Sequence, residues 1–157
     1  MNLSVAKKNA LKAWREADNK GKSLLENLYG KEIFQNQNVM DRIKTFEDAL
    51  QETGRPDMPD FSCLPEDVRK YFEAQYKMIV ITEALNEGWR PDWNNSNEYK
   101  YFTWFTMTPS SFAFGRSYYE YSDADAGSGS RLKFKTRELA EYASKQFVDI
   151  WKDIQLG

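Results

Sequence analysis

The segment from Trp89 to Tyr121 constrains the fold of this chain most, because half of its 24 aromatic side chains lie there. An aromatic side chain buries roughly 150–250 Å² when it packs, so this segment must supply much of a core or much of a binding surface. The rings gather in two runs, 99–107 and 112–121, which also contain threonine and serine. That composition is typical of β-strands.

We expect the two runs to pair as an antiparallel hairpin, because residues 108–111 (Thr-Pro-Ser-Ser) form a turn between them. If Met107 pairs with Phe112, the alternation of side chains assigns every residue to a face. One face then carries Tyr99, Tyr101, Thr103, Phe105, Met107, Phe112, Phe114, Arg116, Tyr118 and Glu120. The other carries Lys100, Phe102, Trp104, Thr106, Ala113, Gly115, Ser117, Tyr119 and Tyr121.

Neither face is polar, although an antiparallel sheet that is covered on one side normally presents a hydrophilic face to water. Three explanations are open. Helices cover both faces, and the small residues Ala113 and Gly115 let one of them approach closely. Alternatively, an exposed face rich in tyrosine meets a protein partner or a second copy of the chain. In the third case, the rings stack on the bases of a single-stranded nucleic acid.

The chain after the hairpin predicts a third strand and a helix. Residues 131–135 alternate, with Leu132 and Phe134 on one face and Arg131, Lys133 and Lys135 on the other. Thr136 then caps a helix that extends to residue 155 and keeps its apolar residues at helical spacing.

Helices are predicted before the hairpin. Thr45 begins one with the pattern of a capping box, and Gly54 ends it. Pro65 suits the first turn of a longer helix that extends to residue 87. The second half of this helix is apolar on nearly all sides, which indicates that it is the central helix. We therefore predict an α+β fold with N-terminal helices, a long central helix, a three-stranded antiparallel meander and a C-terminal helix.

Two further helices are expected near the N-terminus, at residues 5–17 and 20–29. Ser4 and Asp18-Asn19 can cap them, and Gly30 can end the second. The polar residues 35–38 (Gln-Asn-Gln-Asn) are typical of a linker. We expect an N-terminal helical hairpin arm at 1–35 and an α+β core domain at 36–157.

The chain has no histidine and a single cysteine, Cys63. Ser-His-Asp and Cys-His nucleophiles, the usual zinc sites and an internal disulfide are thereby excluded. Residues 123–127 (Asp-Ala-Asp-Ala-Gly) have the start of a calcium loop, but the third acid is missing and Phe134 stands where the loop needs Glu. We expect no catalytic residue, no metal and no cofactor, and an enzyme using carboxylates is the remaining catalytic alternative.

The formal net charge of −2 is unevenly distributed, since residues 1–22 hold six basic and two acidic residues and the remainder holds 16 and 22. A basic leading segment suits contact with nucleic acid or an acidic partner, although a solvated helix face is the simpler explanation. The longest apolar run, residues 78–81, is too short to span a membrane, and the N-terminus lacks the pattern of a signal peptide. We expect a cytoplasmic protein without membrane contact.

Three stretches together resemble a family of small uncharacterised proteins from phage and integrated elements of anaerobic gut bacteria. They are residues 42–49 (Arg-Ile-Lys-Thr-Phe-Glu-Asp-Ala), 83–93 (Glu-Ala-Leu-Asn-Glu-Gly-Trp-Arg-Pro-Asp-Trp) and 129–135, which continue into 138–143. The likeness covers about residues 40–155, and the helices that end at Gly30 are similar to a leading module of such proteins. The resemblance implies a mobile-element context and no catalytic activity.

We expect an accessory protein that binds a protein partner or assembles with itself through an aromatic sheet surface. The alternative is a single-stranded nucleic-acid-binding protein that uses rings for stacking and cations for phosphate contact. The candidate binding residues are Tyr99, Tyr101, Arg116, Tyr118, Arg131, Lys133 and Lys135.

Overall fold

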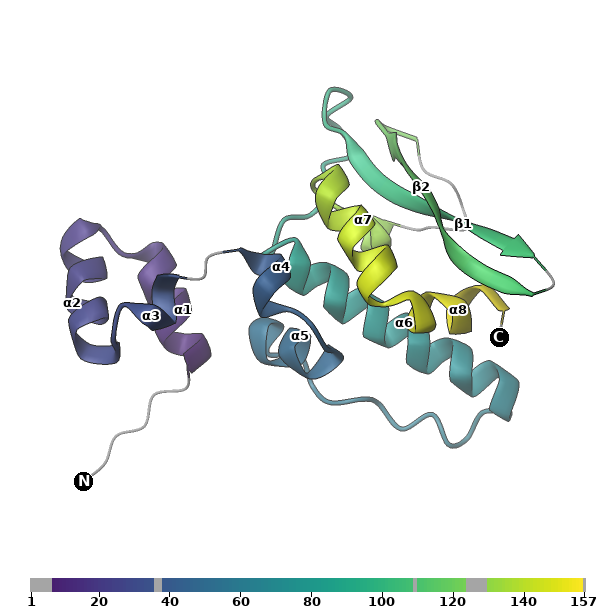
Figure 1. Ribbon diagram of the computed structural model, residues 1–157, viewed down its shortest axis with the longest axis horizontal. Coiled ribbons are helices and arrows are strands. Elements are labelled where there is room, and N and C mark those ends of the chain that lie inside the picture. The colour runs from purple at the N-terminus through teal and green to yellow at the C-terminus, as the bar shows by residue number, and fades with distance from the viewer. Residues whose placement is uncertain (1–6, 36–37, 109, 124–129, 157) are drawn as a thin grey trace. The chain divides into compact units, whose positions relative to one another are not determined.

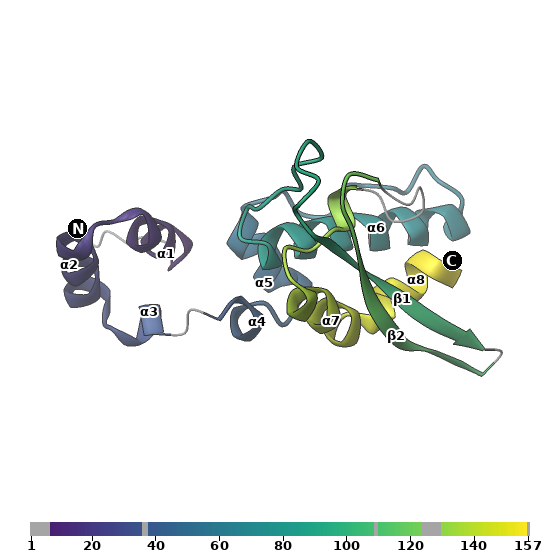
Figure 2. The same ribbon diagram turned by 90° about the horizontal axis from the view of Figure 1, so that it is seen from above.

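The computed structural model describes residues 7–35, 38–108, 110–123 and 130–156. The chain divides into two compact units, Met1–Arg42 and Ile43–Gly157, and each is described by itself. Figure 1 and Figure 2 show the helices of the first unit and the helices and hairpin of the second.

The first unit is helical. It contains α1 (Lys7–Glu16), α2 (Asn19–Tyr29), α3 (Glu32–Gln35) and α4 (Val39–Arg42). Its small core is formed by Ala10, Leu11 and Phe34, and the Trp14 ring stacks on Phe34 with 5.5 Å between centroids. Leu25 and Tyr29 of α2 are partly buried against this core, whereas Leu24 and Leu28 of the same helix stay exposed.

Local capping explains where α2 begins and ends. The Gly21 N–H donates to the Asp18 carboxylate at 2.8 Å, and Gly30 ends the helix with a φ of 87°. Both helices predicted near the N-terminus are therefore confirmed. The predicted cap at Ser4 lies outside the described residues.

The second unit is built around α6 (Glu66–Leu85), which packs on α5 (Phe46–Thr53) and α8 (Val148–Leu156). The part of α6 that is apolar on nearly all sides is buried, with Met78, Val80 and Ile81 fully inaccessible. The predicted central helix is confirmed. At α5, Thr45 and Asp48 form the predicted capping box, and Gly54 ends the helix in the left-handed conformation.

The predicted C-terminal helix is wrong as a single element, because the structure has two helices there. α7 (Arg137–Gln146) and α8 are separated at Phe147, whose ψ of 33° is not helical. Phe147 is buried, and beyond it Trp151 packs against Phe105 with 5.3 Å between ring centroids. The break redirects α8 so that one helix covers the hairpin near its base and the other lies along α6.

The sheet consists of β1 (Lys100–Thr108) and β2 (Ser111–Glu120), paired antiparallel as predicted. The predicted third strand over 131–135 is wrong, because only Phe134 pairs with β1 in the described residues. The Tyr101 N–H donates to Phe134 O at 3.0 Å, and the Phe134 N–H donates to Tyr101 O at 2.8 Å. The 3₁₀ helix η1 (Ser130–Leu132) precedes this bridge and Thr136 caps α7 directly after it, so there is room for only one bridged residue.

A β-bulge changes the faces of the hairpin. Met107 pairs with Phe112 as predicted, but Trp104 pairs with Arg116 while Phe105 pairs with Phe114, so Gly115 is an extra residue in β2. The face assignment is therefore wrong for every β2 residue after the bulge, because one extra residue reverses the alternation. Arg116, Tyr118 and Glu120 share a face with Lys100, Phe102 and Trp104, whereas Ser117, Tyr119 and Tyr121 share the face of Tyr99 and Tyr101.

Gly115→Val is expected to lower the free energy of unfolding by about 1–2 kcal/mol, because the bulge leaves no space for a side chain. A Cβ atom at this position would lie 3.0 Å from the Thr106 hydroxyl and 3.2 Å from the Trp104 carbonyl oxygen. Ala113→Val, at an exposed position of the same strand, is the matched control and should change stability little. Urea denaturation measures both, and equal effects of the two substitutions would contradict the tight bulge.

Candidate functional site

The strongest candidate is the sheet face that the bulge creates, which we call the open face and define as Phe102, Trp104, Arg116 and Tyr118. Trp104 is 49% exposed and Tyr118 is 51% exposed, which is unusual for such large apolar side chains. The Arg116 guanidinium lies 5.8 Å from the Trp104 ring centroid and 5.4 Å from that of Tyr118. One cation therefore sits against two half-exposed rings from neighbouring strands.

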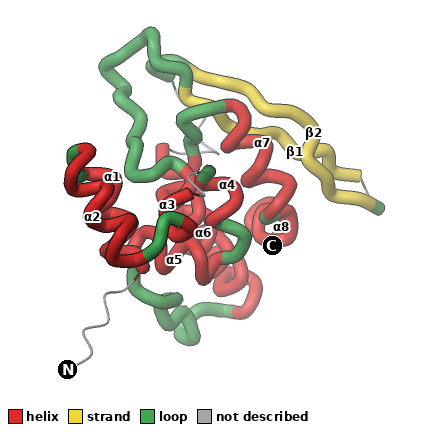
Figure 3. The backbone as a smooth tube through the Cα atoms, turned by 60° about the vertical axis from the view of Figure 1, so that its left-hand side comes forward, coloured by secondary structure: helices red, strands yellow, loops and turns green. Residues whose placement is uncertain are grey.

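Helices pack on the opposite face of the hairpin. Trp151 of α8 contacts Phe105, the Lys145 ammonium of α7 lies 5.0 Å from the Phe114 ring, and Ser117 donates to Glu141 at 2.9 Å. Figure 3 shows α7 and α8 on one side of the hairpin and, in the part of the chain that the structure describes, no helix on the other. Of the three explanations for two aromatic faces, coverage by helices on both sides is therefore wrong for the described residues.

A buried ion pair supports the base of the open face. Lys133, predicted on a polar strand face, is instead fully buried, and its ammonium lies 2.5 Å from Glu120 Oε2. The same ammonium lies 4.1 Å from the centroid of Phe102. Because Glu120 and Phe102 belong to β2 and β1, Lys133 joins both strands to the segment that precedes α7.

Four tyrosines form a second aromatic group on the helix-covered face, next to Arg137 at the start of α7. This tyrosine cluster consists of Tyr99, Tyr101, Tyr119 and Tyr121. The Tyr99 and Tyr119 ring centroids are 4.6 Å apart. Hydrogen bonding to Tyr99, then burial and then Tyr119 raise the pKa of the Tyr121 hydroxyl well above its ordinary value. The four rings thus pack on one another, which accounts for much of this group without a ligand.

The seven candidate binding residues do not form one site. Arg116 and Tyr118 belong to the open face. Tyr99 and Tyr101 belong to the tyrosine cluster and line a shallow cleft of about 310 Å³ together with Lys135. Arg131 lines a different cleft near the end of α6, and Lys133 is inside the core.

Phe102 and Trp104 are the residues of the open face that are absent from the predicted binding residues. A register without a bulge puts both on the face of Gly115 and Ser117, away from Arg116 and Tyr118. The available signal was Gly115 itself, since an isolated glycine within a strand pattern often marks a bulge.

No protein-family model matches the chain, and neither a curated protein nor a solved structure proved similar to it. Among the helices in the described ranges, none has the length and apolar character needed to cross a membrane. The functional argument accordingly rests on the geometry of the open face.

Proposed function

We propose that this chain is a non-catalytic binding protein that captures a protein partner on its open face. The observation that carries the proposal is the half-exposed pair Trp104 and Tyr118 with Arg116 held against both rings. Tryptophan, tyrosine and arginine are the residues in which binding energy concentrates at protein interfaces. Covering two half-exposed rings on association stabilises a complex by removing their apolar area from water.

The geometry favours an extended acidic segment of the partner. Arg116 offers a planar donor for a carboxylate, and the rings on either side of it offer flat surfaces for proline or other apolar side chains. Ring contact with Arg116 restricts its side chain before binding, so less conformational entropy is lost in the complex.

A second copy of the chain is a poorer occupant of the open face. In a two-fold symmetric dimer the same patch meets itself, which would bring two Arg116 guanidinium groups close together. The unit Ile43–Gly157 also has 19 acidic and 14 basic residues, a formal net charge of −5 that opposes its own association. The bulge at Gly115 further disfavours pairing along the β2 edge.

Single-stranded nucleic acid is the second candidate, because exposed rings beside a cation suit base stacking. The net charge of −5 on this unit opposes a nucleic acid, which brings a negative charge with every nucleotide, more than it opposes a short peptide segment that places a carboxylate on Arg116. The resemblance to proteins of phage and integrated elements is compatible with either partner in an accessory role.

The test measures binding of the full chain to a capped peptide of alternating proline and glutamate, its glutamine counterpart and a short oligothymidylate. We expect the glutamate peptide to bind most tightly and Trp104→Ala to weaken it about 30-fold, which corresponds to about 2 kcal/mol. Arg116→Gln should remove the preference for glutamate over glutamine. Lys152→Gln, an exposed charge change on α8, is the control.

Three other results would contradict the binding of an acidic segment. Tighter binding of oligothymidylate with a steep loss of affinity in salt would support the nucleic-acid alternative. A mass that rises with concentration in light scattering, and falls with Trp104→Ala, would support self-assembly. If neither Trp104→Ala nor Arg116→Gln changes the affinity, the open face is not the binding site.

A further inference from the structure

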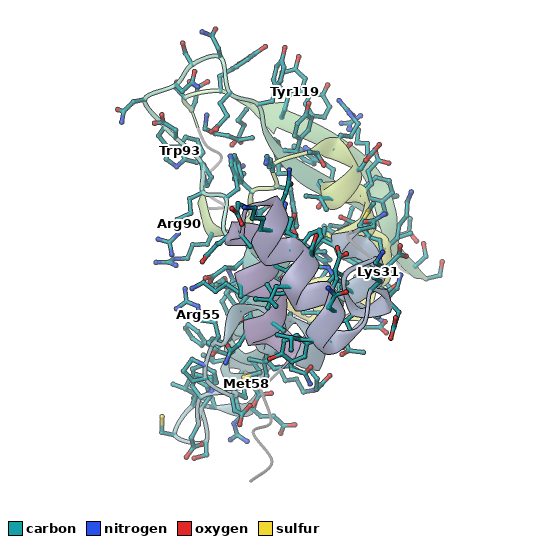
Figure 4. All side chains as sticks on the ribbon, turned by 90° about the vertical axis from the view of Figure 1, so that its left-hand side faces the viewer. Lys31, Arg55, Met58, Arg90, Trp93 and Tyr119 are labelled. Atoms are coloured by element: carbon teal, nitrogen blue, oxygen red, sulfur yellow. The ribbon has the colours of Figure 1, made fainter. Side chains whose placement is uncertain are left out.

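A second site, independent of the open face, lies at the C-terminal end of α6, and we call it the tryptophan cleft. It encloses about 220 Å³, and its walls include Trp89, Arg90, Trp93, Arg131 and the Thr82 side chain. Figure 4 shows Arg90 and Trp93 projecting on the same side of the unit as Arg55. Two indole rings and two guanidinium groups therefore face one small space.

The loop that supplies the two tryptophans is held in place by Glu98 and Lys100. The Glu98 carboxylate accepts from the Trp89 indole N–H at 3.2 Å and from the Asp92 N–H at 2.8 Å. The Lys100 ammonium is fully buried, donates to the Asn95 and Glu98 carbonyl oxygens at 3.2 and 3.0 Å, and lies 5.3 Å from the Trp93 ring. The loop that carries Trp89 and Trp93 is thus held by contacts within the chain.

The cleft has an excess of positive charge. Glu83 faces it, but its carboxylate already accepts from Arg55 at 2.9 and 2.7 Å. Arg90 and Arg131 are exposed, and no ion pair joins either of them to a carboxylate of the described residues. The negative end of the α6 dipole is worth about half a charge, so the two cations outweigh it.

The Thr82 hydroxyl is an unexplained polar group in the wall of the cleft. The residue is 2% exposed, and its oxygen has no hydrogen-bond partner in the described part of the chain. Buried hydroxyl groups are normally paired, because an unpaired one costs free energy on folding. A group of this kind, lining a cleft, is explained by a ligand that supplies the missing partner.

We infer that the tryptophan cleft binds a small aromatic acid. An apolar cavity of about 150 Å³ accommodates benzene, so the larger volume here admits one ring system with an acidic substituent. The ring would lie against the indoles, the carboxylate would meet Arg90 and Arg131, and a polar ring atom would meet Thr82. Such a ligand would cover the indole rings, balance the excess positive charge and hydrogen-bond to the Thr82 hydroxyl.

The probe is indole-3-acetate, followed by titration calorimetry and by the NMR signals of the Trp89 and Trp93 indole N–H groups. We expect saturable binding with a Kd on the order of 0.1–1 mM, as ligand size suggests. Indole-3-acetamide, which lacks the charge, should bind about tenfold more weakly, and so should indole-3-acetate to Arg131→Gln. Lys70→Gln, an exposed charge change on α6, should bind like the parent protein.

Thr82→Val separates a ligand role from a structural one. It should weaken binding about threefold to tenfold without lowering the Tm, because the hydroxyl has no partner to lose. Thr53→Val is the matched control: its hydroxyl donates to Ala49 O at 2.8 Å, so its loss should lower the Tm by about 3 °C and leave binding unchanged.

The inference is overturned if neither indole signal shifts saturably, or if indole-3-acetamide binds as well as the acid. It is also overturned if Arg131→Gln and Thr82→Val both bind like the parent protein. None of these results bears on the open face, whose test uses different ligands and residues.

Discussion

Lys133→Met should lower the free energy of unfolding by about 3–5 kcal/mol, the largest effect expected for a single substitution in this chain. The ammonium is fully inaccessible and the Glu120 side chain is only 14% exposed, so removing the cation leaves a carboxylate in a poorly solvated place. Lost contact with the Phe102 ring adds to the effect. Urea denaturation monitored by circular dichroism measures the change.

The double substitution Lys133→Met with Glu120→Gln should recover much of the lost stability, because a neutral amide then replaces the carboxylate that has lost the Lys133 ammonium. Lys135→Met, two residues away and exposed, is the matched control and should have an effect below about 0.5 kcal/mol. If Lys133→Met changes the free energy of unfolding as little as Lys135→Met does, Lys133 is not buried against Glu120.

Asn86→Ala should lower the free energy of unfolding by about 2–4 kcal/mol, because it removes one buried and one partly buried hydrogen bond to the backbone. The Asn86 amide nitrogen donates to Lys133 O at 2.8 Å, and its oxygen accepts from the Lys135 N–H at 3.0 Å. These bonds join the end of α6 to the segment that bridges β1. Sequence interpretation assigned no role to this residue.

Two measurements test the role of Asn86. The Lys135 amide should lose protection from hydrogen exchange in Asn86→Ala, in addition to the fall in stability. Asn97→Ala, an exposed asparagine in the next loop, should change neither quantity. An unaltered Lys135 amide would show that the side chain does not join these segments.

The helices of this protein were predictable because their signals are local. Thr45 and Asp48 satisfy each other's backbone groups within one turn, and Gly54 and Gly30 end helices in conformations that glycine adopts readily. The nearly all-round apolar character of α6 likewise indicated a buried central helix, as found. Each of these features depends on residues within a few positions of one another.

The candidate site was only partly predictable. The aromatic hairpin and the Met107–Phe112 pairing were foreseen, but the bulge at Gly115 reversed the second half of β2 and joined Trp104 to Arg116 and Tyr118. Alternation could indicate two aromatic faces without indicating which residues share each one. The extra residue Gly115 decides which residues share a face. The bulge that contains it depends on pairing between two strands, and neither strand alone reveals it.

The amino-acid sequence by itself determined most of the longer helices, the hairpin and an α+β class. Only the tertiary structure decided that residues 131–135 form a single bridge instead of a strand, that Phe147 divides the last helix, and that Lys133 is buried. The physical reason is the distance along the chain between the interacting groups. Asn86 and Lys133, or Phe105 and Trp151, are remote in sequence, so local propensity contains no information about whether they meet.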